Sequence, residues 1–335
     1  MTTRRDALLS LLLAPAALSC TRSEGAGSAA PRNALKIAVI PKGTTHEFWK
    51  SVHAGAAKAA KELGVQMIWK GPLKEDDLKS QIDIVENMVA LGVAGIVLAP
   101  LNDKALVGAV KAAVGAKIPV VIFDSALQGR DCVRFVATDT AGAGARAAEH
   151  LARLLASKGK LLVLRYQEGS ASTAAREDGF LGAVQKMHAD LTVVSDNQYG
   201  GATTESALTA AENLLAAHKA AEGGVDGIFC PNESTTFGML LALQKANLAG
   251  KIKLVGFDAS EKLIKGLRDG SIAALAVQNP FLMGDLALHA IVDSLQGRPP
   301  QPRIDTGVRM VTRADLEDPA VKELIHPDLE KWLGE

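Results

Sequence analysis

The chain has 335 residues, of which 48% are hydrophobic and 22% are charged, a composition typical of a folded globular protein long enough for two domains. Lys and Arg together number 37, as do Asp and Glu, so the formal net charge is zero. Because the chain lacks the basic excess that nucleic-acid binding requires, we expect no nucleic-acid partner.

The first 34 residues differ in character from the rest. Arg4 and Arg5 precede an apolar run from Ala7 to Ser19, which is typical of a secretory signal and too short to span a membrane. The run ends in ALSC, which resembles a bacterial lipobox that would make Cys20 a lipidated first residue, whereas TTRRDALL resembles a twin-arginine export signal. A plain signal peptide cleaved nearby is the third alternative. The lipobox and the twin-arginine signal are compatible with each other. All of these interpretations predict a periplasmic or otherwise extracytoplasmic protein, and the lipobox alone would attach it to the membrane, through lipid on Cys20.

Strand-like and helix-length segments alternate after the leader. Helices are predicted at residues 47–63 and 75–91, between strands at residues 35–40, 65–69, 95–99 and 118–123. This is the rhythm of βαβ units and a parallel sheet. The pattern then repeats, because GVAGIVLAPLN is echoed by GVDGIFCPN and IPVVIFDS is echoed by IKLVGFDA. The sequence therefore predicts an α/β fold of two similar lobes, each with a doubly wound parallel sheet.

Polar residues gather after the predicted strands in both halves. In the first half they occupy residues 42–49 and include Asp124, and in the second half they occupy residues 168–176 and include Asn232 and Asp258. Ligands of open parallel sheets bind beyond the carboxyl ends of the strands. Two such edges facing each other would form a cleft that closes around a small polar ligand.

The stretch THEFWKSVHAG, residues 45–55, raises the alternative of a metal site because it carries His46 and His53. Seven helical residues separate the two rings by about 10 Å along the axis, which is too far for one zinc ion. The zinc-protease pattern also requires a second His four residues after the first. We therefore predict no metal ion and no cofactor.

Three other features are weighed in the same way. The segment GAGARA, residues 142–147, does not follow a strand directly, as a dinucleotide fingerprint must, and is interpreted as a small-residue helix start that permits close packing. The sequence contains no nucleophile elbow and no phosphate-binding loop, so we predict no enzymatic activity. Cys132 and Cys230 are far apart and are expected to be unpaired.

Several motifs, taken in order, resemble the periplasmic sugar-binding proteins of ABC importers, especially the ribose-binding type with the type I periplasmic binding protein fold. They are EFW, VIFDS, ATDTAGAG, FCPNE, VGFDAS and VQNP. The resemblance extends from Leu35 to about Leu333. It implies a ligand cleft between lobes joined by a three-segment hinge near residues 138–139, 278–279 and 307–308. The lobes would comprise residues 35–138 with 279–307, and residues 139–278 with 308–335.

The candidate ligand site combines residues that this resemblance implies with residues at strand ends and at the hinge: His46, Phe48, Trp49, Asp124, Ser125, Thr138, Arg176, Tyr199, Asn232, Asp258 and Gln278. The resemblance implies that the two aromatic rings lie against the apolar face of a sugar, that the two aspartates accept hydrogen bonds from adjacent hydroxyls, and that Arg176, Asn232 and Gln278 donate. Charged and amide partners around aromatic area suit a polyhydroxylated ligand. Ser125 stands where the ribose-binding type has arginine, and His46 where it has an amide, so ribose itself is in question.

Structural roles for the same residues stay open at this point. The two aromatics could pack under the first helix, the aspartates could cap helices, the arginine could pair with an acid, and the amides could be turn or hinge residues. We expect an exported, monomeric solute-binding protein that captures a monosaccharide or polyol and delivers it to an ABC permease in the membrane. The alternative is a sensory protein that presents its ligand to a membrane receptor.

Overall fold

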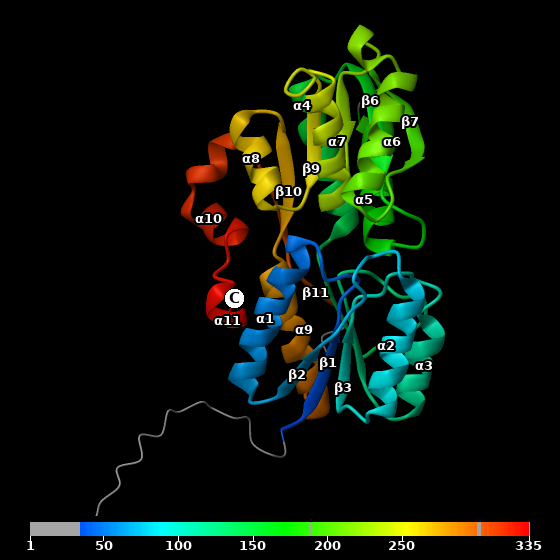
Figure 1. Cartoon of the computed structure of the whole chain (residues 1–335), viewed down its shortest axis with the longest axis vertical. Coiled ribbons are helices and arrows are strands. Elements are labelled where there is room, and N and C mark those ends of the chain that lie inside the picture. Colours follow the sequence, from blue (N-terminus) through cyan, green and yellow to red (C-terminus); the bar gives the residue numbers. More distant parts are fainter. Residues whose placement is uncertain (1–33, 188, 300–302, 335) are drawn as a thin grey trace, which may run out of the picture.

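The computed structural model of the protein describes residues 34–187, 189–299 and 303–334. Two lobes lie one above the other along the long axis of the molecule, and each is a twisted sheet with helices on both faces (Figure 1). Cys20 and the predicted export signals lie outside the described residues. No helix in the described part of the chain is both long and apolar enough to cross a membrane.

The first lobe is built on a six-stranded sheet in the order β11-β5-β4-β3-β1-β2, and every pair of neighbours is parallel. Its strands are β1 (Lys36–Ile40), β2 (Gln66–Trp69), β3 (Gly95–Leu98), β4 (Val120–Phe123), β5 (Arg134–Ala137) and β11 (Arg303–Asp305). The helices around it are α1 (Glu47–Leu63), α2 (Leu78–Ala90), α3 (Val107–Gly115) and α9 (Pro280–Leu295). One apolar core joins the sheet to α1 and α9, and a second core on the opposite face joins it to α2 and α3.

The second lobe repeats this plan, with a sheet in the order β12-β10-β9-β8-β6-β7. Its strands are β6 (Gly159–Arg165), β7 (Leu191–Tyr199), β8 (Gly227–Phe229), β9 (Lys253–Phe257), β10 (Ala274–Gln278) and β12 (Val308–Val311). Only the pairing of β12 with β10 is antiparallel. The longer helices are α4 (Thr140–Leu154), α5 (Ala171–Met187), α6 (Thr204–Ala217), α7 (Glu233–Lys245) and α8 (Glu261–Asp269), and the short ones are η1 (Ala220–Glu222), η2 (Arg313–Glu317), α10 (Pro319–Ile325) and α11 (Glu330–Leu333).

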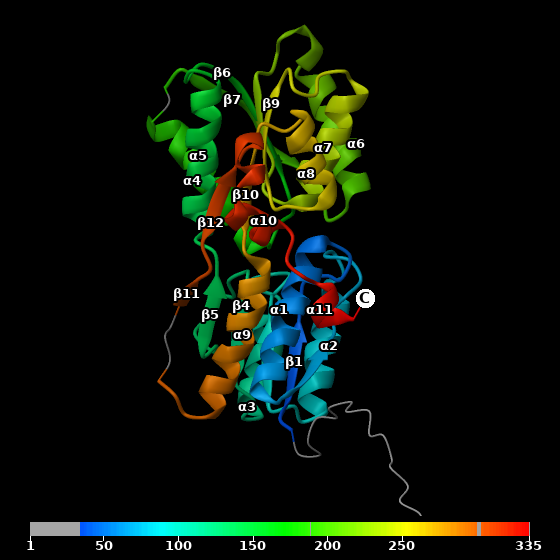
Figure 2. The same ribbon diagram turned by 90° about the vertical axis from the view of Figure 1, so that its left-hand side faces the viewer.

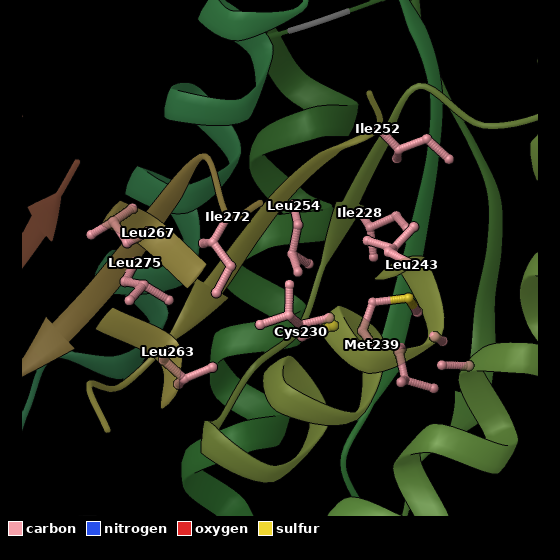
Figure 3. Packing of buried hydrophobic residues seen from close by; sticks show 14 of the residues in the cluster. Ile228, Cys230, Met239, Leu243, Ile252, Leu254, Leu263, Leu267, Ile272 and Leu275 are labelled. Atoms are coloured by element: carbon pink, nitrogen blue, oxygen red, sulfur yellow. The ribbon is translucent and has the colours of Figure 1, made fainter. Parts of the chain in front are cut away.

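The strand order of the two sheets corresponds element by element, which confirms the prediction of two similar doubly wound lobes. Buried apolar side chains fill the second lobe between its sheet and helices α7 and α8, among them Cys230, Met239 and Leu254 (Figure 3). Both Cys132 and Cys230 are free, as expected.

The chain crosses between the lobes at three points. It crosses after β5, after β10, and between β11 and β12, so the strands on either side of each crossing belong to different sheets. The chain then returns toward the first lobe, because α11 lies beside α1 in both views (Figures 1 and 2). There the Lys61 ammonium lies 5.8 Å from the centre of the Trp332 ring.

Close helix contacts explain the small-residue segments. A Cβ atom at Gly144 would lie 2.0 Å from the carbonyl oxygen of Arg176, and one at Gly179 would lie 2.1 Å from that of Ala141. Glycine therefore permits α4 and α5 to touch backbone to backbone, and GAGARA serves this packing. In the first lobe, Gly55 makes the same approach between α1 and α9, since its Cβ would lie 1.9 Å from a carbonyl oxygen of α9.

The predicted bounds of one helix need correction. Helix α1 runs from Glu47 to Leu63 as predicted, but α2 begins at Leu78 instead of residue 75. The reason is the cap: the Asp77 side chain accepts a hydrogen bond from Ser80 N at 3.0 Å and so starts the helix there. Glu75 is consequently a loop residue, and this frees its side chain for the site described next.

Candidate ligand-binding site

A pocket lies between the two lobes and is lined by side chains from both. Eight of the predicted residues line it, namely His46, Phe48, Trp49, Asp124, Arg176, Asn232, Asp258 and Gln278. The structure thus brings these eight residues, from both lobes and from six different segments of the chain, to one place. Five further lining residues were not among the candidates: Lys42, Glu75, Ser172, Thr173 and Glu233.

Two aspartates occupy equivalent positions in the two lobes. Asp124 follows β4 with φ of 58°, and Asp258 follows β9 with φ of 68°. Each donates its backbone N–H to the neighbouring strand, to Val136 O and Ala276 O, at 2.9 Å. A left-handed backbone is uncommon for residues other than glycine and is found preferentially at functional sites. Both carboxylates are buried, so this shared geometry presents two acids to the pocket.

Lys42, which follows β1, supplies the cation next to Asp124. Its ammonium lies 3.0 Å from Asp124 Oδ2 and donates hydrogen bonds to Ser172 Oγ at 3.0 Å and Ser170 Oγ at 3.3 Å. A buried charge is tolerated when it is paired and hydrogen-bonded in this way. The ribose-binding type has an arginine at the position of Ser125, and in this chain Lys42, which follows β1, places a positive charge next to Asp124 instead.

Arg176 and Gln278 retain unused hydrogen-bonding capacity. Arg176 donates from Nη1 to Pro231 O at 2.9 Å, and its guanidinium lies over the Phe257 ring at 4.2 Å. Gln278 donates from Nε2 to Asp258 Oδ1 at 2.7 Å. Within the described part of the chain, Arg176 Nε and Gln278 Oε1 are buried and have no hydrogen-bond partner. One donor and one acceptor thus remain for a polar ligand.

Helix α7 presents its first residues to the pocket. The Asn232 side chain accepts a hydrogen bond from Thr235 N at 3.2 Å, so it caps the helix as well as lining the pocket. Glu233 donates its N–H to Asp258 Oδ2 at 3.1 Å and accepts from Phe48 N, at the start of α1 in the other lobe, at 3.3 Å. Burial raises the pKa of Glu233 to about 7, against the opposing influence of protonated His46. Burial likewise raises the pKa of Asp258.

The aromatic pair packs in the core of the first lobe and also borders the pocket. The rings of Phe48 and Trp49 meet edge to face at 4.9 Å, and Trp49 meets Phe123 at 6.1 Å in the apolar core of the first lobe. Both residues nevertheless line the pocket. Core packing thus fixes the rings, while part of their surface stays available to a ligand.

The carboxylate of Glu75 gathers three donors. Its Oε1 lies 2.7 Å from His46 Nδ1 and accepts from Trp49 Nε1 at 2.7 Å, and its Oε2 accepts from the Tyr166 hydroxyl of the second lobe at 2.7 Å. Burial opposes both charges of the His46–Glu75 pair, but their mutual attraction prevails. It raises the pKa of His46 to about 9 and lowers that of Glu75 to about 2.

Three predicted residues lie outside the pocket lining. The Ser125 hydroxyl is buried and accepts from Ser172 N at 3.1 Å. Thr138 lies at the first crossing, where its hydroxyl is 3.1 Å from that of Thr306. Tyr199 is 42% exposed at the end of the edge strand β7, away from the pocket. No group of three or more His, Cys, Asp or Glu residues among those described is placed to hold a metal ion.

Several hydrogen bonds across the pocket hold the lobes together. They include Lys42 with Ser172 and Glu75 with Tyr166, and also a backbone bond from Asp103 N to Gly169 O at 3.0 Å. The structure is accordingly a closed form, in which the lobes meet around the site.

Comparison with known proteins agrees with this architecture. Residues 37–299 match the family described as periplasmic binding protein domain. The chain is 29% identical to the ribose import binding protein of Bacillus subtilis (strain 168) over 268 residues, which cover 79% of this chain and 83% of the relative.

Two solved structures match most of the chain. A carbohydrate transporter solute binding protein from Agrobacterium radiobacter, in complex with D-arabinose, has a TM-score of 0.84 and 32% identity and covers 88% of this chain and 100% of its own. An ABC transporter solute binding protein from Agrobacterium vitis, with bound D-fucose, has a TM-score of 0.82 and 34% identity and covers 87% and 100%. The chain belongs to the family of periplasmic binding proteins, as the sequence motifs indicated, and its relatives are sugar-binding proteins of ABC importers.

Proposed function

We propose that this protein captures a monosaccharide or a linear polyol in the pocket between its lobes and delivers it to the permease of an ABC importer. The observation that carries the proposal is the convergence of two aspartates, an arginine, a glutamine and two aromatic rings on one closed pocket. Acceptors, donors and aromatic area in one place suit a ring with apolar faces and a rim of hydroxyls. The ligands named for the two related structures, D-arabinose and D-fucose, are of this kind.

The ligand is electrically neutral in this proposal. The Lys42 ammonium is paired with Asp124, and His46 is paired with Glu75. These two cations already have counter-charges, so a phosphate or carboxylate on the sugar would find only Arg176, whose Nη2 lies 4.0 Å from Asp124 Oδ1, as a further cation in the lining. Glu233 and Asp258 lie near each other and, whenever they are ionised, would repel an anionic ligand further.

The remaining features follow from the same proposal. We propose that the eight predicted residues in the pocket contact the ligand, and that Lys42, Ser172, Thr173 and Glu233 join them. The lobe boundaries at residues 138, 278 and 307 remain a proposal, which the membership of β11 and β12 in different sheets supports. The position of α11 beside α1 favours assigning residues 330–333 to the first lobe. Capture needs no covalent step, so the protein is not an enzyme.

We place the protein in the periplasm as a monomer, tethered to the membrane through lipid on Cys20. The family membership supports the location, and the apolar run before the cysteine supports export. A sensory role is less favoured because the relatives are named as import-binding and transporter proteins. Mass spectrometry of the membrane-bound protein would reveal a lipidated Cys20 as the first residue of the mature chain.

A thermal-shift panel tests the proposed ligand class. The purified protein is melted with D-ribose, D-arabinose, D-fucose, D-allose, xylitol and a sugar phosphate. A sugar present at 100 times its Kd stabilises the folded state by about 2.7 kcal/mol, which corresponds to several degrees in Tm for a protein of this size. We expect at least one neutral sugar or polyol to raise the Tm and the sugar phosphate to leave it unchanged. A panel in which no neutral sugar or polyol acts would contradict the proposal.

A further inference from the structure

Glu75 lines the pocket and makes contacts with both lobes. It comes from the loop before α2, its side chain is 8% exposed, and both of its oxygens are occupied by hydrogen-bond donors. The three donors come from two places: His46 and Trp49 from the start of α1, and Tyr166 from the position after β6 in the other lobe. The Gln167 side chain adds a second bond between lobes, from Nε2 to Glu75 O at 2.9 Å.

This arrangement determines how His46 can meet a ligand. The ring has two nitrogens, and Nδ1 lies 2.7 Å from the Glu75 carboxylate. When the ring is protonated, both nitrogens are donors, so Nε2 remains as a donor for the pocket that His46 lines. A neutral ring would leave one nitrogen without a proton, and the ligand would then face an uncharged partner. The carboxylate therefore controls what His46 offers.

The same carboxylate fixes the aromatic surface. The indole N–H of Trp49 donates to Glu75 Oε1, and this bond sets the rotation of the indole relative to Phe48. The Tyr166 hydroxyl can reach Oε2 only when the lobes are closed, because Tyr166 belongs to the second lobe. One side chain thus joins the stacking surface, the charged donor and the closing contact.

We propose that Glu75 is a positioning residue for ligand capture, which holds His46 as a charged donor and Trp49 as a fixed stacking surface and links both to lobe closure through Tyr166. The inference rests on the proposed function, because the ligand that these groups meet is the captured sugar.

The surrounding charges define what a substitution should do. His46 is faced by Glu75 from the loop before α2, by Glu233 from α7 and by Asp258 from the segment after β9. Glu75 is also faced by Lys42, which follows β1, and by Tyr166. The change Glu75→Gln keeps the shape and one acceptor but removes the closest counter-charge of His46. Burial, which disfavours the imidazolium, then acts on His46 with less opposition, and its pKa falls.

The first experiment needs no ligand. The ring ¹⁵N shifts of the histidines are followed by NMR from pH 5 to 10, with the His46 signals assigned through their loss in His46→Gln. In the wild type we expect the His46 ring to stay protonated at pH 7.5, well above the ordinary midpoint near 6.5. In Glu75→Gln it should be neutral at pH 7.5. A wild-type His46 ring that is neutral at pH 7.5 would overturn the inference.

The second experiment measures the Kd of the sugar that stabilises the wild type most, at pH 5.5 and pH 8, by calorimetry. Because Glu233 titrates in every variant, the informative quantity is the ratio of the variant Kd to the wild-type Kd at each pH. For Glu75→Gln we expect a ratio of about 10 or more at pH 8, since a charged hydrogen bond is lost, and a several-fold smaller ratio at pH 5.5, where His46 regains its proton.

Tyr166→Phe is the matched control, because it removes the contact between lobes and leaves the His46–Glu75 pair intact. It should raise Kd by a similar factor at both pH values. A Glu75→Gln ratio that is the same at both pH values would indicate a merely structural role and contradict the inference. If His46 is protonated as expected but no sugar binds the wild type, the proposed function fails while the pairing stands; if sugars bind and the ring is neutral, the inference alone fails.

Discussion

Replacing Asp258 with asparagine separates its role toward the ligand from its role in the fold. The carboxylate already accepts hydrogen bonds from Gln278 Nε2 at 2.7 Å and from Glu233 N at 3.1 Å. Alanine would leave both donors unsatisfied, at a cost of about 1–3 kcal/mol each. It would also place an ordinary residue at φ of 68°, a region that asparagine tolerates better. Asp258→Asn therefore retains the backbone geometry and one of the two acceptors.

The expected magnitude follows from these contacts. The oxygen that becomes an NH₂ group no longer accepts, so one donor loses its partner and the free energy of unfolding falls by about 1–3 kcal/mol. The ligand loses an acceptor of the charged kind, which contributes about 1.5–3 kcal/mol, so Kd should rise about 10- to 100-fold. The unliganded protein should still melt cooperatively, a few degrees below the wild type.

Calorimetry with the best sugar, together with melting curves with and without it, measures both effects. Asp131→Asn is a suitable control because it makes the same chemical change at an exposed residue outside the pocket, and it should alter neither quantity. A Kd for Asp258→Asn within about twofold of the wild type would refute the argument that this carboxylate accepts from the ligand, since about 1.4 kcal/mol corresponds to each tenfold change.

Other consequences of the structure can be checked in the same way. Gly179→Ala should destabilise the protein by about 1–3 kcal/mol, because the added Cβ would lie 2.1 Å from a carbonyl oxygen of α4. Gly182→Ala in the same helix faces open space and should stabilise the protein by about 0.5–1 kcal/mol. Urea unfolding compares the two variants, and equal effects would contradict the packing argument. Asp124→Asn removes the counter-charge of the buried Lys42 and should lower the free energy of unfolding by about 3–5 kcal/mol, more than Asp258→Asn does. Melting curves that show the larger loss for Asp258→Asn would contradict a stabilising role of the Lys42–Asp124 ion pair. Burial raises the pKa of Glu177 to about 7 from an ordinary 4.5, so its contribution to stability is complete below pH 4.5 and is lost as the pH rises through 7. The difference in unfolding free energy between pH 5 and pH 8 should therefore be smaller in Glu177→Gln than in the wild type, by up to about 3 kcal/mol. An unchanged difference would refute the raised pKa.

The fold could be predicted from the sequence because its signals are local and occur twice. Residues 92–102 and 224–232 carry the same apolar run and polar ending, and they became β3 and β8 with their following loops. Helix α1 has the predicted bounds because its pattern begins and ends at residues of clear preference. The predicted start of α2 is wrong because three consecutive acidic residues, 75–77, precede the helix, and only the hydrogen bond made by Asp77 shows which of them caps it.

The site could be predicted only in part, since some of its residues act across the gap between lobes. Asp124 and Asp258 are visible because each ends a repeated strand motif. Lys42 and Glu75 carry no such signal, and each has a partner distant in the chain: Asp124 lies 82 residues after Lys42, and Tyr166 lies 91 residues after Glu75. A sequence shows that a charged residue follows a strand, but not which buried charge it will meet.

Tyr199 illustrates the converse limit. It ends a strand, much as Asp124 and Asp258 each follow one, but its strand is β7 at the edge of its sheet. Asp124 and Asp258 follow β4 and β9, which lie inside their sheets, and the order of strands in space cannot be obtained from their order in the chain. A position at the end of a strand is therefore not sufficient to bring a residue to the pocket.

In the proposed function, recognition and closure are coupled because the same charged groups line the pocket and join the lobes. Lys42 donates to Ser172 of the second lobe, Glu75 accepts from Tyr166, and the carboxylate of Glu233 accepts from Phe48 N at the start of α1, where a helix N-terminus favours negative charge. In an open form these groups would bond to water, so each contact contributes only modestly to closure by itself. A ligand that meets the same side chains adds binding energy only in the closed form, and this differential affinity shifts the population toward closure. Substitutions that weaken the contacts between lobes should consequently raise Kd even where the substituted atom never touches the sugar.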